Sequence, residues 1–357
     1  MSMECGVYHT SYASDVALRA KPVEKLRLAV FVLALLVFPF LASTYWLTLA
    51  NQVAIATIGA IGLNILVGYT GQISLGQGAF MAVGAYGAGL LTLEAGLPWG
   101  VSIALASLLT AAVGTFFGLP SLRLKGLYLA IATLAAQEIV EWILTHWTAL
   151  TGGTEALVVP ASRLFGVRLN TDFSFYWIAI ALAGLTALFT ANLFRSRAGR
   201  AFVAIRDQDI AASVIGVNVF RYKLLAFATS SFFVGLAGAL IAYYRNIVTW
   251  ERFTLETSIA YLAMIIVGGL GTIRGSLFGA ALITLLPALI TNLGGALQGV
   301  APAVAAILPY IQQAAFGIVI VLFLIFEPEG LSKIWGNVKD YFHVWPFAYR
   351  RGESRVG

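Results

Sequence analysis

Two acidic residues, Glu138 and Glu141, stand in an otherwise apolar stretch, with the amide of Gln137 beside the first. They are three positions apart, so a helix places them on one face. A carboxylate pair of this kind suits general acid and base chemistry. Catalysis is not indicated, because His9, His146 and His343 are scattered and no metal-ligand spacing accompanies the pair.

Glu138 falls near the middle of a predicted membrane helix, where a charged carboxylate costs about 2.5–3.5 kcal/mol on insertion scales. Its presence there requires a compensating environment. We predict that Gln137 and Glu138 line an internal translocation pathway. The alternatives are that Glu138 pairs with a backbone or amide group as a structural link, or that the predicted helix boundary is misplaced.

A second interruption, residues 68–78, carries four glycines, two glutamines and a serine between two apolar runs. Unwound backbone at membrane depth is tolerated only where protein or a watery cavity satisfies it. We therefore predict a re-entrant or broken helix that lines the pathway, although an ordinary tight cytosolic turn is the alternative. The predicted pathway residues here are Gly71, Gln72, Ser74, Gly76, Gln77 and Gly78. Residues 268–279 are a second, weaker glycine-rich segment that precedes an apolar run. This partial repetition suggests that the chain consists of two related halves.

A third polar element is the loop 148–173, which begins with Thr151, Gly152, Gly153 and Thr154. The glycines permit a tight turn whose exposed backbone N–H groups could meet a carboxylate. A plain connecting loop explains the same residues equally well.

The elements that must position these residues are membrane helices. Hydrophobic residues make up 60% of the 357 residues and charged residues only 11%, far from the usual composition of soluble proteins. The single cysteine, Cys5, excludes an internal disulfide and a cysteine metal cluster. We predict an all-α polytopic membrane protein with about ten spans. The predicted spans are 28–46, 51–67, 78–93, 99–119, 126–147, 174–194, 224–244, 257–271, 275–293 and 307–326.

The distribution of Lys and Arg orients this topology. With a cytosolic N-terminus, 18 of the 22 basic residues fall on the inside and only Arg163, Arg168, Arg245 and Arg252 on the outside. This asymmetry is typical of the positive-inside rule and predicts that both termini are cytosolic. It also explains the net charge of +6 without nucleic-acid binding. The predicted division is a cytosolic segment at 1–27, a membrane domain at 28–326 with an external loop at 148–173, and a cytosolic tail at 327–357.

The long charged segment 195–223 is the largest predicted cytosolic loop, and it contains a short helical sequence with two alanines and a closing glycine. A protein that takes force from a soluble motor needs such a docking element. A solvated linker helix is the alternative. The chain has no Gly-Lys pair and hence no P-loop, so any ATP must bind to another chain.

Seven stretches together resemble the permease subunits of branched-chain (hydrophobic) amino acid ABC importers, in particular the longer of the two paired permeases. They are GQISLGQGAF (71–80), LKGLYLAIATL (124–134), LTGGT (150–154), SRAGRA (196–201), RYKLLAF (221–227), IVGGLGT (266–272) and FEP (326–328). They occur in order over residues 50–330. Glu329 is a departure, since relatives often carry arginine there.

The resemblance implies an importer-permease fold whose cytosolic coupling helix docks on an ATPase. The family pattern Glu-Ala-Ala, three residues, then Gly falls here on Ile210, Ala211, Ala212 and Gly216, so an isoleucine replaces the glutamate. Small alanines let such a helix seat deeply, and the glycine closes it with a left-handed turn. The predicted coupling residues are Arg206, Asp207, Asp209, Ile210, Ala211, Ala212 and Gly216.

The same resemblance implies a second homologous permease, two cytosolic ABC ATPase subunits that hold ATP and Mg, and a periplasmic solute-binding protein. It also implies a location in the bacterial cytoplasmic (inner) membrane, with no cofactor bound by this chain. Branched-chain amino acids are the family default, while related permeases serve urea, short amides and aromatic acids. A stand-alone channel or secondary transporter would act without an ATPase, and a membrane-embedded enzyme would need a cluster of His, Asp or Glu.

Overall fold

Apolar runs of this chain form helices, since a helix satisfies its own backbone hydrogen bonds in lipid. The computed structural model describes residues 22–119, 126–160, 163–164, 167–168, 171–298, 304–327 and 329–344. The helices are α2 (Pro22–Leu41), α3 (Thr44–Thr70), α4 (Gln77–Leu93), α5 (Trp99–Gly118), α6 (Leu127–His146), α7 (Thr148–Thr151), α8 (Asp172–Arg195), α9 (Arg197–Val214), α10 (Val219–Arg245), α11 (Leu255–Gly268), α12 (Ile273–Gln298), α13 (Val304–Phe326), α14 (Leu331–Val344) and the 3-10 helix η2 (Trp250–Phe253).

The predicted all-α class is confirmed, with four two-residue strands that the sequence did not predict. These are β1 (Leu157–Val158), β2 (Arg163–Leu164), β3 (Val167–Arg168) and β4 (Ile247–Val248). Strand β1 pairs with β4 and β2 pairs with β3, both antiparallel. The β1–β4 pair ties the loop that follows α7 to the end of α10.

Each of the ten predicted spans corresponds to a helix, but their lengths differ from the prediction. Within the described part of the chain, seven helices are long and apolar enough to cross a membrane. Helix α4 and the apolar part of α2, Ala29–Leu41, are shorter, and α11 has 14 residues. The predicted first span was wrong at its end, because the helix stops at Leu41 and α3 begins at Thr44 after an extended Ser43.

Several predictions concern residues outside the described ranges. They include Cys5, His9, most of the segment 1–27, the stretch around Arg123 and Lys125, Pro328 and the end of the tail. From Pro22 the chain is helical, so α2 begins six positions before the predicted span.

The core lies where α3, α4 and α10 meet, with α5 packed against the last two. Of the apolar window of α3, 89% is buried, whereas none of the window of α13 is. Glycines allow the closest approach. A Cβ added at Gly84 of α4 would overlap the backbone of Gly235 in α10. The hydrophobic effect does not drive association between helices in lipid. Small residues at helix contacts instead let the backbones approach closely and pack by van der Waals contact.

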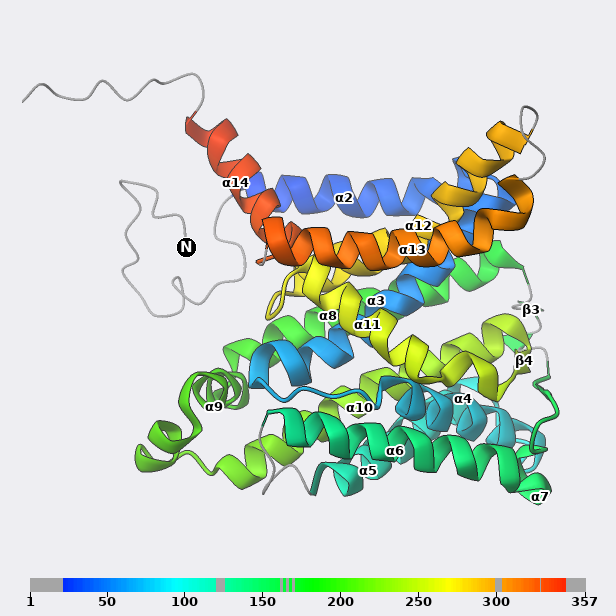
Figure 1. Ribbon diagram of the computed structural model, residues 1–357, viewed down its shortest axis with the longest axis horizontal. Coiled ribbons are helices and arrows are strands. Elements are labelled where there is room, and N and C mark those ends of the chain that lie inside the picture. Colours follow the sequence, from blue (N-terminus) through cyan, green and yellow to red (C-terminus); the bar gives the residue numbers. More distant parts are fainter. Residues whose placement is uncertain are drawn as a thin grey trace, which may run out of the picture.

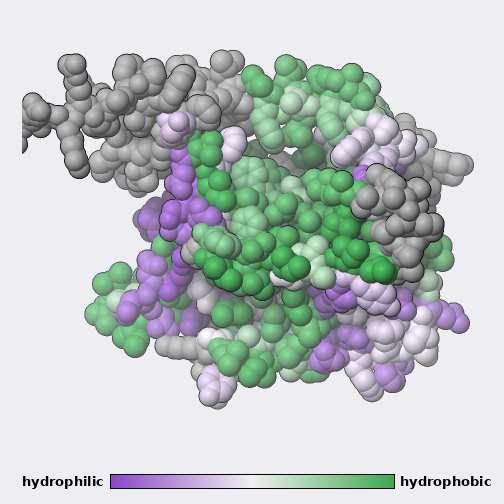
Figure 2. Space-filling view, turned by 45° about the horizontal axis from the view of Figure 1, so that its top comes forward, coloured by the Kyte–Doolittle hydropathy of each residue, from purple (hydrophilic) through white to green (hydrophobic). Residues whose placement is uncertain are grey.

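The two ends of the helix bundle differ in what they carry. Figure 1 shows α9 at one end, while α7, β3 and β4 lie at the opposite end. The start of α2 and helix α14 lie at the α9 end. Figure 2 shows hydrophobic residues across the middle of one face and hydrophilic residues gathered toward its two ends. The predicted coupling segment and the predicted external loop therefore lie at opposite ends, as the topology requires.

Candidate functional site

The glycine-rich interruption after α3 is not a tight turn. Gly71, with φ of 67°, ends α3 in the left-handed conformation, and residues 71–76 then run without helical structure to α4. Six residues in this state span at most about 20 Å. We name residues 71–76 the crossing. Figure 1 shows it as a thin blue coil that runs from the end of α3 to the start of α4.

Helix α4 begins deep within the bundle. The side chain of Gln77 donates from Nε2 to the carbonyl of Gly59 over 3.1 Å. Gly59 lies 11 residues before the end of α3, which corresponds to about 16 Å along the helix at 1.5 Å per residue. The prediction of a broken helix is thus confirmed for the backbone, and the tight-turn alternative is wrong.

Side chains from two other helices cap the start of α4. Gln137 Oε1 accepts from the Ala79 N–H at 2.6 Å, and the Ser258 hydroxyl accepts from the Gly78 N–H at 2.8 Å. These amides have no partner within their own helix. The Thr133 hydroxyl of α6 supports the crossing in the same way by accepting from Leu75 N–H at 2.9 Å.

The side chains of the crossing alternate between the interior and the surface. Gln72, Ser74 and Gly76 are buried, as are Gln77 and Gly78 beyond them, whereas Gly71 is exposed. The buried residues therefore lie inside this chain and form internal contacts. The exposed side of the crossing is the one that a neighbouring chain or a watery pathway can reach.

The prediction groups Gln137 with Glu138, but the first is buried within the bundle and the second is exposed. Gln137 is 1% exposed and also donates from Nε2 to the Phe253 carbonyl at 2.6 Å, so it is a structural link. Glu138 is exposed on the outer face of the chain. It lies in an open depression of about 480 Å³ that is lined by Glu138, Ile139, Glu141, Trp142 and Thr145. The indole of Trp142 stacks on His146 with ring centroids 4.7 Å apart.

The predicted coupling segment is a pair of helices. Helix α9 is interrupted at Gln208, whose φ of −160° and ψ of 100° are extended, so Arg197–Asp207 and Asp209–Val214 are separate helical pieces. The second piece ends at Gly216, which has φ of 89° as the predicted closing glycine requires. We name Asp209–Val214 the coupling helix.

Apolar side chains cover the free face of the coupling helix. Ile210, Val214 and Ile215 are 68%, 81% and 77% exposed, and we name these three residues the apolar tip. Ala211 is exposed beside them, whereas Ala212 is 2% exposed and packs within this chain. The two predicted alanines thus have different roles, one on the free surface and one beneath it. An exposed apolar tip on a charged segment is typical of a protein contact.

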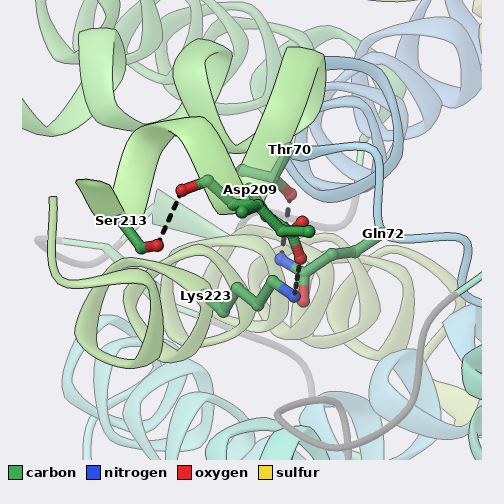
Figure 3. Close-up of polar contacts among 6 residues, drawn as sticks. Thr70, Gln72, Asp209, Ser213 and Lys223 are labelled. Atoms are coloured by element: carbon green, nitrogen blue, oxygen red, sulfur yellow. Dashed lines mark hydrogen bonds and ion pairs between the residues drawn. The ribbon is translucent and has the colours of Figure 1, made fainter. Parts of the chain in front are cut away.

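The charged residues of the coupling segment also differ in their exposure and contacts. Arg206 and Asp207 are exposed and Asp209 is half-buried, and both Arg206 and Asp209 contact other helices of the chain. Asp209 Oδ2 lies 3.6 Å from the ammonium of Lys223 in α10, and Lys223 is 7% exposed. Figure 3 shows these two side chains turned toward each other, with Gln72 pointing to the same cluster. Each predicted coupling residue is therefore on or next to the coupling helix.

The predicted external loop begins with a helix cap. Thr151 is buried, and its hydroxyl donates to Leu144 O at 2.7 Å. Gly152 and Gly153 both have positive φ, but their N–H groups already donate to Thr148 O and to the Thr151 hydroxyl. Thr154 is exposed. This arrangement explains the motif as the end of α7.

Sequence reasoning missed three residues that hold the site together, Asn64, Lys223 and Ser258. Asn64 of α3 is 1% exposed and bonds to three groups in residues 271–276. Lys223 was included only as the end of a basic loop. A polar residue within a long apolar run is the signal that could have found Asn64, because such a group needs a partner when buried.

Together these features define the class of the chain, a multi-pass α-helical membrane protein with a broken helix in its interior and an exposed coupling helix at one end. Its sequence matches, over residues 45–326, the model of the family described as branched-chain amino acid transport system / permease component. The chain belongs to this family.

Relatives agree with the family match. The chain is 35% identical over 281 residues to the high-affinity branched-chain amino acid transport system permease protein LivM of Salmonella typhimurium, covering 71% of this chain and 66% of the relative. It is 34% identical over 273 residues to LivM of Escherichia coli K12, with coverage of 70% and 64%. The probable LivH permease of Methanocaldococcus jannaschii is 29% identical over 244 residues, with coverage of 65% and 76%.

The matched region thus spans about two thirds of the length of the LivM proteins. No solved structure matches the chain significantly.

Proposed function

We propose that this chain is a membrane subunit of an ATP-driven importer for branched-chain or other small hydrophobic amino acids. The exposed apolar tip on the coupling helix carries this proposal, because a protein that worked alone would not present Ile210, Val214 and Ile215 to water at the end of a charged segment. The family match and the names of the LivM relatives support the substrate class.

The importer holds a second homologous permease, two cytosolic ATPase subunits that bind ATP and Mg, and a periplasmic solute-binding protein. The permease relatives named LivM and LivH support the pairing of two such chains. In this assembly the chain lies in the bacterial inner membrane with ten spans and both termini in the cytosol. The 18 basic residues in the predicted cytosolic segments support that orientation.

Reconstitution tests the proposal directly. Liposomes that contain this chain, its partner permease and the ATPases, with the binding protein supplied outside, should accumulate labelled leucine, isoleucine or valine only when ATP is inside. The chain without the ATPases should move none of them. Uptake by this chain alone would contradict the proposal and indicate a channel or a secondary transporter.

The coupling helix docks on an ATPase subunit through Ala211 and the apolar tip. A tryptophan at Ala211 should block docking, because this residue is exposed at the free face of the helix. We expect Ala211→Trp to lower ATPase co-purification at least tenfold without loss of monodisperse membrane protein. Normal co-purification and coupled uptake in this variant would place the docking surface elsewhere.

The outer face of α6 forms part of the pathway wall. Glu138 is exposed on this chain at the middle of α6, and a carboxylate at that depth faces water or protein far more often than lipid. The pathway then runs between the two permeases, with the exposed side of the crossing on the same route. Gln72, Ser74 and Gln77 support this wall from within.

Glu138→Gln tests the pathway assignment. Uptake should fall several-fold, while assembly and basal ATP hydrolysis stay normal, because the variant keeps the shape of the side chain and removes its charge. Glu94→Gln is the matched control, since Glu94 is an exposed carboxylate at the end of α4. Equal uptake in both variants would make Glu138 a scaffold residue.

A further inference from the structure

Two charged side chains, one on each side of the kink at Gln208, reach from the coupling segment toward the membrane helices. Arg206 precedes the kink and Asp209 follows it. The ion pair of Asp209 with the buried Lys223 joins the coupling helix to α10, which packs against α3, α4 and α5. The segment around the kink is therefore attached to the membrane helices at two points, through Asp209 after the kink and through Arg206 before it.

Arg206 binds the end of α3. Its Nη1 donates to the carbonyl of Gly68 over 2.8 Å. Gly68 lies in the last turn of α3, where carbonyls lack a partner within the helix and the helix dipole favours a positive charge. A charge-assisted hydrogen bond of this kind is stronger than one between neutral groups. The contact links residues 138 positions apart in the sequence.

The same guanidinium lies against the second glycine-rich break, residues 269–272 between α11 and α12. A Cβ at Gly271 would lie 2.8 Å from Arg206 Nη1, so no side chain other than hydrogen fits there without a shift. Gly271 has φ of 71° and therefore already favours glycine. The aliphatic part of Arg206 lies over the first break, 3.5 Å from the Cβ position of Gly71.

The second break packs against the last turns of α3 beneath Arg206. Asn64 of α3 accepts from the Gly271 N–H at 2.9 Å and donates to the Thr272 carbonyl at 2.9 Å. A Cβ at Gly271 would also lie 3.2 Å from the carbonyl oxygen of Gly68. We name this contact of Gly68, Gly271 and Asn64 the joint. One side chain of the coupling segment thus contacts both the end of α3 and the break between α11 and α12.

We propose that Arg206 is a positioning residue that transmits movement of the coupling helix to the joint between the end of α3 and the second glycine-rich break. This inference rests on the proposed function, and it assigns Arg206 an inward role distinct from ATPase docking. When the ATPase displaces the coupling helix, the kink at Gln208 lets that helix turn while Arg206 pulls on Gly68 and Gly271. The crossing and the start of α12 then shift together.

The test compares three variants in the complete reconstituted importer. In Arg206→Ala, ATP hydrolysis should stay within about twofold of wild type, whereas solute moved per ATP should fall at least tenfold. Arg206→Lys should recover part of that ratio, because an ammonium can donate to Gly68 O but lacks the planar guanidinium that also packs against Gly271. Arg200→Ala is the matched control, since the exposed Arg200 bonds only locally, to Arg195 O at 2.9 Å, and its ratio should not change.

A spin label at Ile73 provides a second readout, which also serves with Arg206→Lys if Arg206→Ala does not assemble. Ile73 is 39% exposed on the crossing. Addition of ATP should change the mobility of this label in the wild-type background and much less in either Arg206 variant. An unchanged ratio of solute to ATP, or an equal label response in all backgrounds, would overturn the role of Arg206. A wild-type complex with no ATP-driven uptake would instead contradict the proposed function.

Discussion

The two glycine-rich breaks of this chain differ in how their backbones are satisfied. The first, the crossing, has six residues, and Thr133, Gln137 and Ser258 support it and the start of α4 from two other helices. The second has four residues, and Asn64 of α3 supports it at two consecutive residues, Gly271 and Thr272. Support for the first break is thus distributed, and support for the second is concentrated in one amide.

This difference indicates how each break responds to movement. The crossing and the start of α4 can lose one of their three supporting hydrogen bonds and keep the other two, so the crossing can shift by small steps. Concentrated support holds the second break at a fixed distance from α3. We therefore expect the second break to move with α3 as a unit, and substitutions to reveal the contrast through their different costs.

The largest effect should follow Asn64→Leu. This change leaves the Gly271 N–H without its partner and removes one hydrogen bond each from the Thr272 carbonyl and the Ser276 hydroxyl, which stay bonded to each other. An unpaired buried group costs about 1–3 kcal/mol and each lost hydrogen bond about 1 kcal/mol, so we expect a loss of about 3 kcal/mol of unfolding free energy after some relaxation. Chemical unfolding of the purified protein in detergent measures it.

Asn292→Leu is the control for this variant. Asn292 is an exposed amide on α12 whose Nδ2 bonds to the Tyr45 hydroxyl at 3.2 Å, and its replacement should have little effect. A loss in Asn64→Leu no greater than in Asn292→Leu would show that the second break does not depend on one residue.

A smaller effect is expected for Gln137→Leu. The variant leaves the Ala79 N–H and the Phe253 carbonyl without their partner and removes an acceptor of the Ser258 hydroxyl, while Ser258 and Thr133 still hold Gly78 and Leu75. We expect a loss of about 2 kcal/mol in the same unfolding measurement. Gln312→Leu, at a half-buried amide of α13, serves for comparison. If Gln137→Leu cost more than Asn64→Leu, the contrast between the breaks would be reversed.

The smallest effect should come from Ser74→Ala. The Ser74 hydroxyl accepts from Gly76 N–H at 3.4 Å, a long contact within the crossing itself. We expect a change below about 1 kcal/mol, the usual net value of a single hydrogen bond. A loss as great as that of Gln137→Leu would show that the crossing depends on its own side chains rather than on α6 and α11.

Much of the fold followed from the sequence, because apolar periodicity and length identify membrane helices directly. All ten predicted spans coincide with helices, and the glycines and glutamines of 68–78 correctly indicated a broken helix. The ends of α2 and α3 were misjudged, since the apolar run continues across the short break at Ala42 and Ser43. Whether ten helices cross the membrane stays a prediction.

The direction of side chains was harder to predict than the helices themselves. Neighbouring residues on a helix point about 100° apart, so Gln137 and Glu138 had to differ, but only the packing of α4 and η2 determines which one is inside. For the same reason Ala211 is exposed while Ala212 is buried. The contacts of Arg206 and Asn64 join residues more than 130 positions apart, and a single sequence carries no signal of such pairs.

The start of α4 has a consequence for how the protein is made. Its first backbone amides depend on Gln137 and Ser258, which are synthesised 58 and 180 residues after the groups they cap. Until α6 and α11 have left the ribosome and entered the bilayer, those amides face lipid or solvent uncapped. The segment formed by α3 and α4 should therefore remain susceptible to quality-control proteases throughout most of translation. Truncated chains that end before Ser258 should be degraded rapidly.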